Sequence, residues 1–255
     1  MDGIFLASLQ EGQGILIPCL VRIFRACLAT GYVPALWCQV KVVFISKPSR
    51  SSYCGPRDFR PISLTLFLLK TMERLVDRFV RDEILVLQPL HPNQHAYQPG
   101  KSVETALHQL VVRVEKALDQ QEIALGVFLD IEGAFDNTSY DSMCLALSRH
   151  GTDLTIVRWI RATLEGRLAT AALGDVTRGC PQGGVLSPLL WCLVVDDLLV
   201  RLEGNVYTQG YAKFSWTIIS LRLLCLMICS SEKSMCVEQF ALTGVECHEI
   251  LDPNL

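Results

Sequence analysis

Two aspartates stand at the end of an apolar run, where a carboxylate can do chemistry. The run Ile123–Leu129 ends on Asp130, and Asp136 lies six residues further on. A carboxylate at the end of a buried strand is destabilising unless it binds a metal ion or a strong hydrogen-bond donor. Oxygen ligands of this kind suit Mg²⁺. Many ordinary turns also carry two aspartates, so this pair alone does not distinguish a metal site from a turn.

A Gly-rich segment, GCPQGGVLSP over residues 179–188, is the second candidate. Its adjacent glycines Gly183 and Gly184 let a backbone approach a ligand closely. The amide of Gln182 can hydrogen-bond a sugar or a base edge, and a following helix would offer its N-terminus. The plain alternative is a tight turn before a helix.

A third candidate is the pair Arg57 and Arg60 in the string RDFRPISL over residues 57–64. The planar guanidinium group of arginine suits phosphate recognition. By themselves, two arginines before a helix also fit an ordinary surface loop.

The elements that must position these residues follow from apolar spacing. Helical spacing predicts helices over 14–31, 63–85, 103–118, 138–149, 153–165 and 187–202, with Ser102 as a cap. Apolar or β-branched runs predict strands over 41–46, 123–129, 168–173 and 206–212; residues 48–61, 86–101 and 178–184 read as loops. The run 123–129 is expected to be a central strand buried on both faces. Irregular alternation of helices and strands favours an α+β fold over a doubly wound sheet.

The composition limits the number of domains and argues against a surface that is basic all over. The 255 residues are 50% hydrophobic, enough for one large domain or two small ones, and the net charge of -3 argues against a basic coat over the whole surface. The segment Lys41–Lys101 contains ten Lys and Arg but only five Asp and Glu. This basic zone fits either phosphate binding or an ordinary solvated surface.

The cysteines and the apolar runs indicate a reducing compartment and no membrane. The 11 cysteines are scattered without a CxxC pair, which favours buried free thiols over zinc sites or disulfides. The N-terminus lacks the pattern of a secretory signal. The longest apolar run, Phe214–Cys229, is shorter than the roughly 20 residues of a membrane span and contains Arg222.

Six strings in a fixed order carry a family resemblance. They are KVVFISKP, RPISL, HPNQHAYQPGKS, FLDIEGAFD, GCPQGGVLSPLLW and YTQGYA, spread over residues 41–212. In this order they strongly resemble the successive blocks of reverse transcriptases from non-LTR (LINE-type) retrotransposons, especially arthropod-type elements. The preceding GYVPALW resembles the lead-in of that family, so the resemblance covers about residues 2–212.

The resemblance implies an α+β right-hand polymerase with fingers and palm. It divides the chain into a helical lead-in (1–40), fingers and palm (41–212) and an unrelated or frameshifted tail (213–255), with no thumb. It implies an RNA template, a DNA primer and dNTP as partners. Asp130 matches the catalytic aspartate that binds both Mg²⁺ ions in the family, and two-metal chemistry needs such a ligand.

The resemblance also assigns nucleotide-binding roles. Phe135 matches the aromatic residue that closes on the sugar 2′ position and helps to reject ribonucleotides. Gln182 and Gly183 match the pair that supports the incoming nucleotide and the template. Lys47 and Arg60 resemble fingers residues that hold the triphosphate. Asp136 is assigned to ordering the turn rather than to binding metal.

The chain departs from the family at its last block. The family has Tyr/Phe-Ala-Asp-Asp there, but Tyr211-Ala212 is followed by Lys213, and the next aspartate is Asp252. The missing carboxylates, with Lys213 in the place of the first one, predict a polymerase site that does not hold Mg²⁺ and is inactive. Glu132 could substitute only in part, because it lies ~6–7 Å along the strand from Asp130.

Three readings of the whole chain stay open at this point. The first is an inactive reverse transcriptase domain. The second is a non-catalytic nucleic-acid-binding protein that uses the basic fingers. The third is a chain that hardly folds, because the palm sheet lacks its last hairpin and the thumb. The change after Ala212 fits a frameshift, a retained intron, a misjoined exon or a genuine unfamiliar segment.

Overall fold

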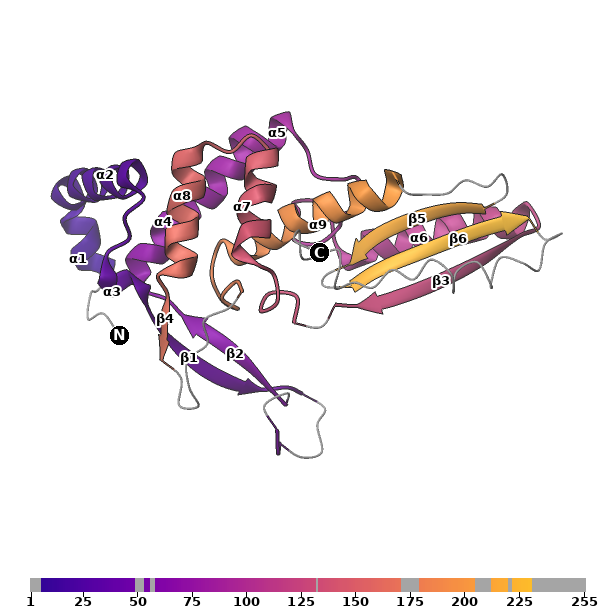
Figure 1. Cartoon of the computed structure of the whole chain (residues 1–255), viewed down its shortest axis with the longest axis horizontal. Coiled ribbons are helices and arrows are strands. Elements are labelled where there is room, and N and C mark those ends of the chain that lie inside the picture. Colours follow the sequence, from indigo (N-terminus) through magenta and orange to yellow (C-terminus); the bar gives the residue numbers. More distant parts are fainter. Residues whose placement is uncertain are drawn as a thin grey trace.

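The computed structural model describes residues 6–48, 53–55, 58–131, 133–170, 179–204, 212–219 and 222–230. Within them, helices and strands mix in one chain (Figure 1). The helices are α1 (Leu6–Glu11), α2 (Gln13–Thr30), α3 (Ala35–Cys38), α4 (Phe67–Phe79), a π-helical turn (Val80–Ile84), α5 (Leu85–Leu87), α6 (Val103–Asp119), α7 (Tyr140–Arg149), α8 (Leu154–Glu165) and α9 (Ser187–Gly204). The strands are β1 (Gln39–Ser46), β2 (Phe59–Leu64), β3 (Glu122–Asp130), β4 (Leu168–Thr170), β5 (Ala212–Ile219) and β6 (Arg222–Ser230).

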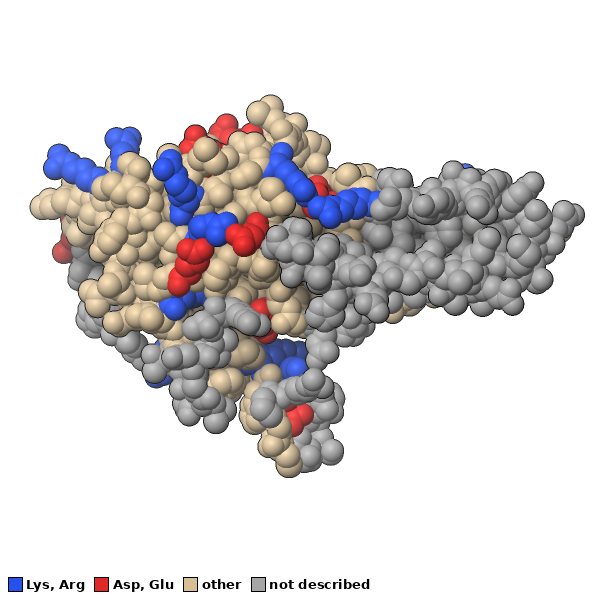
Figure 2. Space-filling model, viewed as in Figure 1, with Lys and Arg blue, Asp and Glu red and all other residues tan. Residues whose placement is uncertain are grey.

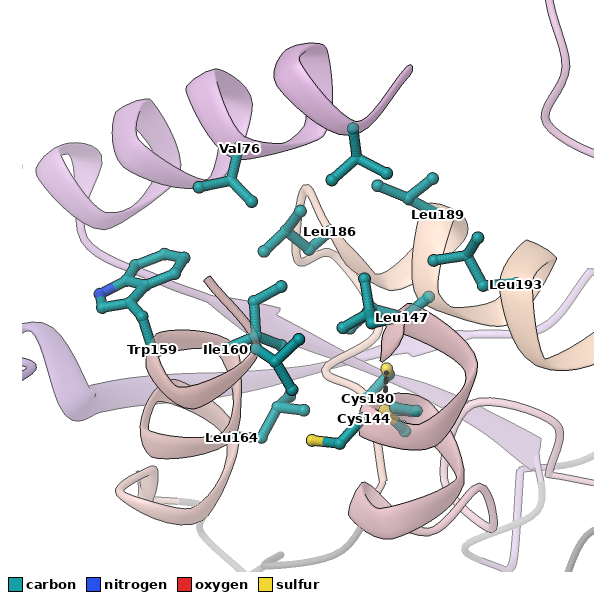
Figure 3. Close-up of a cluster of buried hydrophobic side chains, with 14 of the residues drawn as sticks. Val76, Cys144, Leu147, Trp159, Ile160, Leu164, Cys180, Leu186, Leu189 and Leu193 are labelled. Atoms are coloured by element: carbon teal, nitrogen blue, oxygen red, sulfur yellow. Dashed lines mark hydrogen bonds between the residues drawn. The ribbon is translucent and has the colours of Figure 1, made fainter. Parts of the chain in front are cut away.

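Helices α4, α7, α8 and α9 build the main hydrophobic core. Their apolar side chains point toward one another in Figure 3, where Val76, Leu147, Trp159, Ile160 and Leu193 meet. Leu147, Trp159 and Leu193 are fully buried. The periodicity of the sequence is confirmed for these helices, because a helix that buries one stripe of apolar residues repeats it every three to four positions.

The first sheet has the order β2-β1-β4 and corrects the predicted loop over 48–61. Strand β2 runs antiparallel to β1, with Pro61 opposite Phe44, and β4 runs parallel to β1. Because β2 lies at the edge of the sheet, the missing N–H of Pro61 is tolerated there. The predicted helix from Ser63 is also wrong at its start, since α4 begins at Phe67.

The second sheet has the order β3-β6-β5, in which both pairs are antiparallel. Strand β3 confirms the predicted strand but is an edge strand rather than a central one, and Ile123 and Phe128 are exposed. The expectation that the last hairpin is missing is wrong, because β5 and β6 form one beside β3. The predicted strand over 206–212 lies outside the described residues except for Ala212, as do Glu132 and the end of the predicted strand 168–173.

Helix α6 packs along the second sheet and begins with the predicted cap. The Ser102 side chain accepts a hydrogen bond from the backbone N–H of Thr105, and the Thr105 hydroxyl oxygen accepts one from the Ser102 N–H. Ala106 and Ala117 are buried, whereas much of the expected inward stripe (Val103, Leu107, Val111 and Leu118) is exposed. The apolar pattern therefore predicted the helix correctly but not the burial of its face.

Helix α2 is the one helix in the described ranges that is long and apolar enough to cross a membrane. Core helices of soluble proteins and signal sequences satisfy the same criteria. Phe24 and Cys27 of α2 are buried, and α2 contacts α8. The seven cysteines whose state is described are all free; Cys19 and Cys54 are exposed and the other five are buried, which confirms the reading as buried free thiols for those five.

A buried histidine joins the end of α7 to α9. The Nδ1 atom of His150 lies 2.9 Å from the carbonyl oxygen of Ala146, and its Nε2 lies 3.3 Å from Oδ2 of Asp196. Both ring nitrogens face acceptors, so the imidazolium form can donate a hydrogen bond from each of them. Asp196 raises the pKa of His150 above its ordinary value. Oδ1 of Asp196 also accepts the backbone N–H of His91, which ties in the loop before α6.

The His150–Asp196 pair makes stability depend on pH. Because the folded pKa is raised, the pair stabilises the fold fully below the unfolded pKa of ~6.5, and this contribution is lost as pH rises through the folded value. We expect wild type to exceed His150→Gln by on the order of 1–2 kcal/mol in free energy of unfolding at pH 5.5. Urea titrations of both proteins from pH 5 to 9 measure this difference. A difference that grew with pH would contradict the assignment.

Candidate functional site

The loop 179–187, between β4 and α9, is where the sequence strings meet. Its Gln182 carbonyl oxygen accepts the backbone N–H of Ser63 at 2.7 Å, which joins it to β2. Its Cys180 N–H donates to the carbonyl oxygen of Phe135 at 2.7 Å, which joins it to the turn after β3. Three predicted segments that are far apart in the sequence are therefore held together by backbone hydrogen bonds.

Two glycines permit this close approach. Gly179 has φ +71, and a Cβ there would lie 2.5 Å from the Cα of Asp136 and closer still to the carbonyl oxygen of Phe135. Gly183 has φ +103, and its Cβ would lie 3.0 Å from the carbonyl oxygen of Ser63. A side chain is strained at such φ values and has no room at Gly179, so the segment needs glycine for its packing.

Two buried charged residues, Arg167 and Glu73, contact the loop, and neither was predicted from the sequence. Arg167 donates from Nη2 to the carbonyl oxygen of Gly179 and lies 3.3 Å from the Tyr140 hydroxyl. Glu73 on α4 accepts the backbone N–H of Val185 at 3.0 Å. Burial raises the pKa of Glu73, against the lowering effects of the Val185 hydrogen bond, Lys70 and Arg167. A carboxylate on the buried face of a helix was the one available clue.

Phe135 and Asp136, in the turn after β3, lie in different surroundings. The half-buried Phe135 ring lies between Tyr97 and Trp191, with ring centroids 6.5 and 6.1 Å away. Asp136 lines an open cleft of about 380 Å³ between α7, α8 and Gly179. Burial of its carboxyl raises the pKa of Asp136, and Arg167 opposes that shift. Asp136 also lines a smaller pocket with Arg167, Gln182 and Pro61.

Lys47 and Arg60 lie at the β1–β2 end of the first sheet. The Lys47 N–H donates to the carbonyl oxygen of Asp58 at 2.8 Å, and its own carbonyl accepts the Tyr53 hydroxyl. Arg60 is exposed and pairs with Ile45 across the strands. Neither residue lines the pocket that holds Gln182. Arg57 lies outside the described residues.

The register of the second sheet corrects the expected position of Lys213. Asp130 pairs with Arg222 on β6, and Arg222 pairs with Ile219 on β5, so the end of β5 and the start of β6 lie level with Asp130. Lys213 instead pairs with Ile228, which pairs with Ala124. Ala124 lies six residues before Asp130, about 20 Å along a strand. Lys213 therefore does not stand beside Asp130.

The residues that the register brings to Asp130 do not fit a magnesium pair. The connection runs Ile219-Ser220-Leu221-Arg222 and contains no carboxylate. Mg²⁺ is usually held by carboxylates, and two ions about 3.5–4 Å apart need more than one such ligand. Within the parts of the chain whose side chains are described, no group of three or more His, Cys, Asp or Glu could hold a metal ion.

Comparison with known proteins decides the family. Residues 45–213 match the family model described as reverse transcriptase (RNA-dependent DNA polymerase). The chain belongs to this reverse transcriptase family. The resemblance read from the six strings is thereby confirmed.

The relatives of this reverse transcriptase chain come from insect non-LTR elements. It is 28% identical, over 92% of its length, to the retrovirus-related Pol polyprotein from type-1 retrotransposable element R1 of Bradysia coprophila. It is 28% identical, over 70% of its length, to the RNA-directed DNA polymerase from mobile element jockey of Drosophila melanogaster. The chain spans only 25% and 20% of these two relatives.

Solved telomerases share the fold of this reverse transcriptase chain. Telomerase from Candida tropicalis in complex with the TWJ fragment of telomeric RNA matches 91% of the chain with a TM-score of 0.56 and 10% identity. The apo telomerase from the same organism matches 89% with a TM-score of 0.55 and 11% identity. The chain covers 42% and 46% of those chains.

Proposed function

We propose that this chain is the fingers-and-palm part of a non-LTR retrotransposon reverse transcriptase and that it does not polymerise DNA. In this assignment β1 and β2 belong to the fingers, and the sheet β3-β6-β5 is the palm. RNA template, DNA primer and dNTP are the partners of the intact site, and the setting is intracellular. Family membership and the packing of loop 179–187 against β2 and the turn after β3 support the proposal.

The observation that carries the inactive assignment is the register that sets Arg222, the first residue of β6, opposite Asp130. In a two-metal polymerase, carboxylates from neighbouring strands hold both ions, which activate the primer 3′-hydroxyl and stabilise the leaving pyrophosphate. Asp130 is the one carboxylate that we assign to this site. Arg222, its partner in the register, is a cation rather than a metal ligand. Mg²⁺ in the manner of the family therefore does not fit this chain.

More of the proposed nucleotide-binding residues than of the metal ligands are present in this chain. We assign the sugar-facing position to Phe135, whose ring is held by Tyr97 and Trp191. Gln182 and Gly183 are assigned to supporting nucleotide and template, and their backbone is fixed against Ser63. Lys47 and Arg60 are assigned to the triphosphate. Because they lie outside the pocket around Gln182, this role requires the β1–β2 end to close over a bound nucleotide.

Primer extension tests the proposal. The purified chain, an RNA template with an annealed DNA primer, dNTP and either Mg²⁺ or Mn²⁺ should give no extended product, while an active retroviral reverse transcriptase extends the same primer. Without a second metal ligand, the expected loss is the whole two-metal contribution. Template-dependent incorporation that disappears in Asp130→Ala would refute the inactive assignment.

A further inference from the structure

Helix α4 carries a line of cations on its solvent side. Lys70, Arg74 and Arg78 follow one another at four-residue spacing. Residues four apart lie above one another on a helix, about 6 Å apart along its axis. The buried residues of α4, among them Leu69 and Val76, lie on the other side. Phe67, three residues before Lys70 and 53% exposed, begins the same line, and we call these four residues the α4 basic stripe.

Folding alone does not favour this arrangement. Like charges at four-residue spacing repel one another and weaken a helix. Within the described part of the chain, none of the three cations forms an ion pair. The flanking Asp77 is bound to Arg81 at 3.0 Å. Lys70 interacts electrostatically with the buried Glu73 of the same helix, whereas the exposed Arg74 and Arg78 keep positive charge that a partner with repeated negative charge can neutralise.

The face of the molecule shown in Figure 2 carries isolated basic groups as well as basic groups that touch acidic ones. Basic and acidic groups touch there over α7 and α8. Arg161 pairs with Asp141 and Glu165, and Arg201 of α9 pairs with Asp197 at 3.0 Å. Cations that are already paired with carboxylates gain less from a phosphate, because the ion pair must first be broken. Arg74 and Arg78 of the α4 basic stripe, which form no ion pair in the described part of the chain, do not have this cost.

We propose that the α4 basic stripe binds the backbone of a single-stranded nucleic acid, with Phe67 stacking on one base. This rests on the proposed function and names a surface for its template. Helix α4 begins three residues after β2 ends, and β2 touches loop 179–187 at Ser63, so the stripe leads away from loop 179–187. A single strand fits better than a duplex, because only an unpaired base exposes its face to an aromatic ring.

Salt-dependent binding tests the stripe. Fluorescence anisotropy of a labelled unstructured RNA oligonucleotide of ~20 nucleotides, titrated with the full chain at several salt concentrations, gives the slope of log K against log salt. With ~0.7 of slope for each contacted phosphate of a single strand, Lys70→Ala/Arg74→Ala/Arg78→Ala should make the slope less negative by about 2. Phe67→Ala should weaken binding about tenfold with an unchanged slope.

A matched variant separates the stripe from net charge. Arg22→Ala/Arg25→Ala/Arg158→Ala removes three exposed cations from α2 and α8 and should keep the wild-type slope. An equal change in both triple variants would overturn the proposal, as would wild-type binding by the stripe variant or no RNA binding by wild type. Polyglutamate serves as a probe for an acidic protein partner. If the stripe variant lost binding to polyglutamate but kept binding to RNA, the stripe would be assigned to an acidic protein, and the proposal would be overturned. Failure here leaves the primer-extension result unaffected, so the two proposals fail separately.

Discussion

Replacing both Ser220 and Leu221 with aspartate is expected to give the chain a divalent metal site that depends on Asp130. In the sequence they stand between Ile219, the last residue of β5, and Arg222, which pairs with Asp130. Two carboxylates added there complete the set of oxygen ligands that a pair of ions needs. We expect Mn²⁺ affinity to rise at least tenfold, ~1.4 kcal/mol, in an isothermal titration. The gain should vanish when Asp130→Ala is added.

The control variant places the same two aspartates where the sequence string alone would put them. Lys213→Asp/Phe214→Asp restores Tyr-Ala-Asp-Asp after Tyr211, but the register places Lys213 about 20 Å from the level of Asp130. It also lowers the net charge by three, against two for the first variant, so a general charge effect would favour it. Stronger Mn²⁺ binding by this control would show that the string, and not the register, locates the site.

Gly179→Ala is expected to destabilise the fold strongly. The new Cβ would lie 2.5 Å from the Cα of Asp136, in backbone that cannot yield as the end of a side chain can. Overpacking and a positive φ together cost roughly 2–4 kcal/mol. Urea unfolding of the purified variant measures the loss. Because the same contact holds loop 179–187 against the turn after β3, the packing of that loop should loosen with it.

Gly14→Ala is the matched control for this substitution. Gly14 lies in α2 with nothing within 4 Å of its added Cβ. Alanine is favoured over glycine inside a helix by roughly 0.5–1 kcal/mol, so this variant should unfold at a slightly higher urea concentration. Equal stability of the Gly179 and Gly14 variants would mean that loop 179–187 does not pack as described.

The sequence predicted the helices and the family well, for physical reasons. Apolar residues at helical spacing identify α7, α8 and α9 because one face of each helix is buried, and the six strings identify the reverse transcriptase family. Strand β2 escaped prediction because Pro61 and the polar residues before it read as loop. The edge position of β3 was not predicted, because an apolar run does not reveal how many neighbouring strands a strand has.

The candidate site was predicted in part. The strings named Phe135, Gln182 and Gly183, and the structure fixes their segments together. Arg167 and Glu73 were missed, because single charged residues give no periodic signal until the fold shows what they contact. The position of Lys213 was misjudged because a string match fixes the order of residues along the chain but not the register of a hairpin.

The absence of a two-metal site is tested most directly by counting the Mn²⁺ ions that the native chain binds. Electron paramagnetic resonance distinguishes isolated Mn²⁺ from a spin-coupled pair. We expect no coupled pair in the native chain and no change in bound Mn²⁺ on Asp130→Ala, because the register sets Arg222 opposite Asp130 and the sequence from Ile219 to Arg222 contains no carboxylate. A coupled pair in the native chain that disappears in Asp130→Ala would contradict the account.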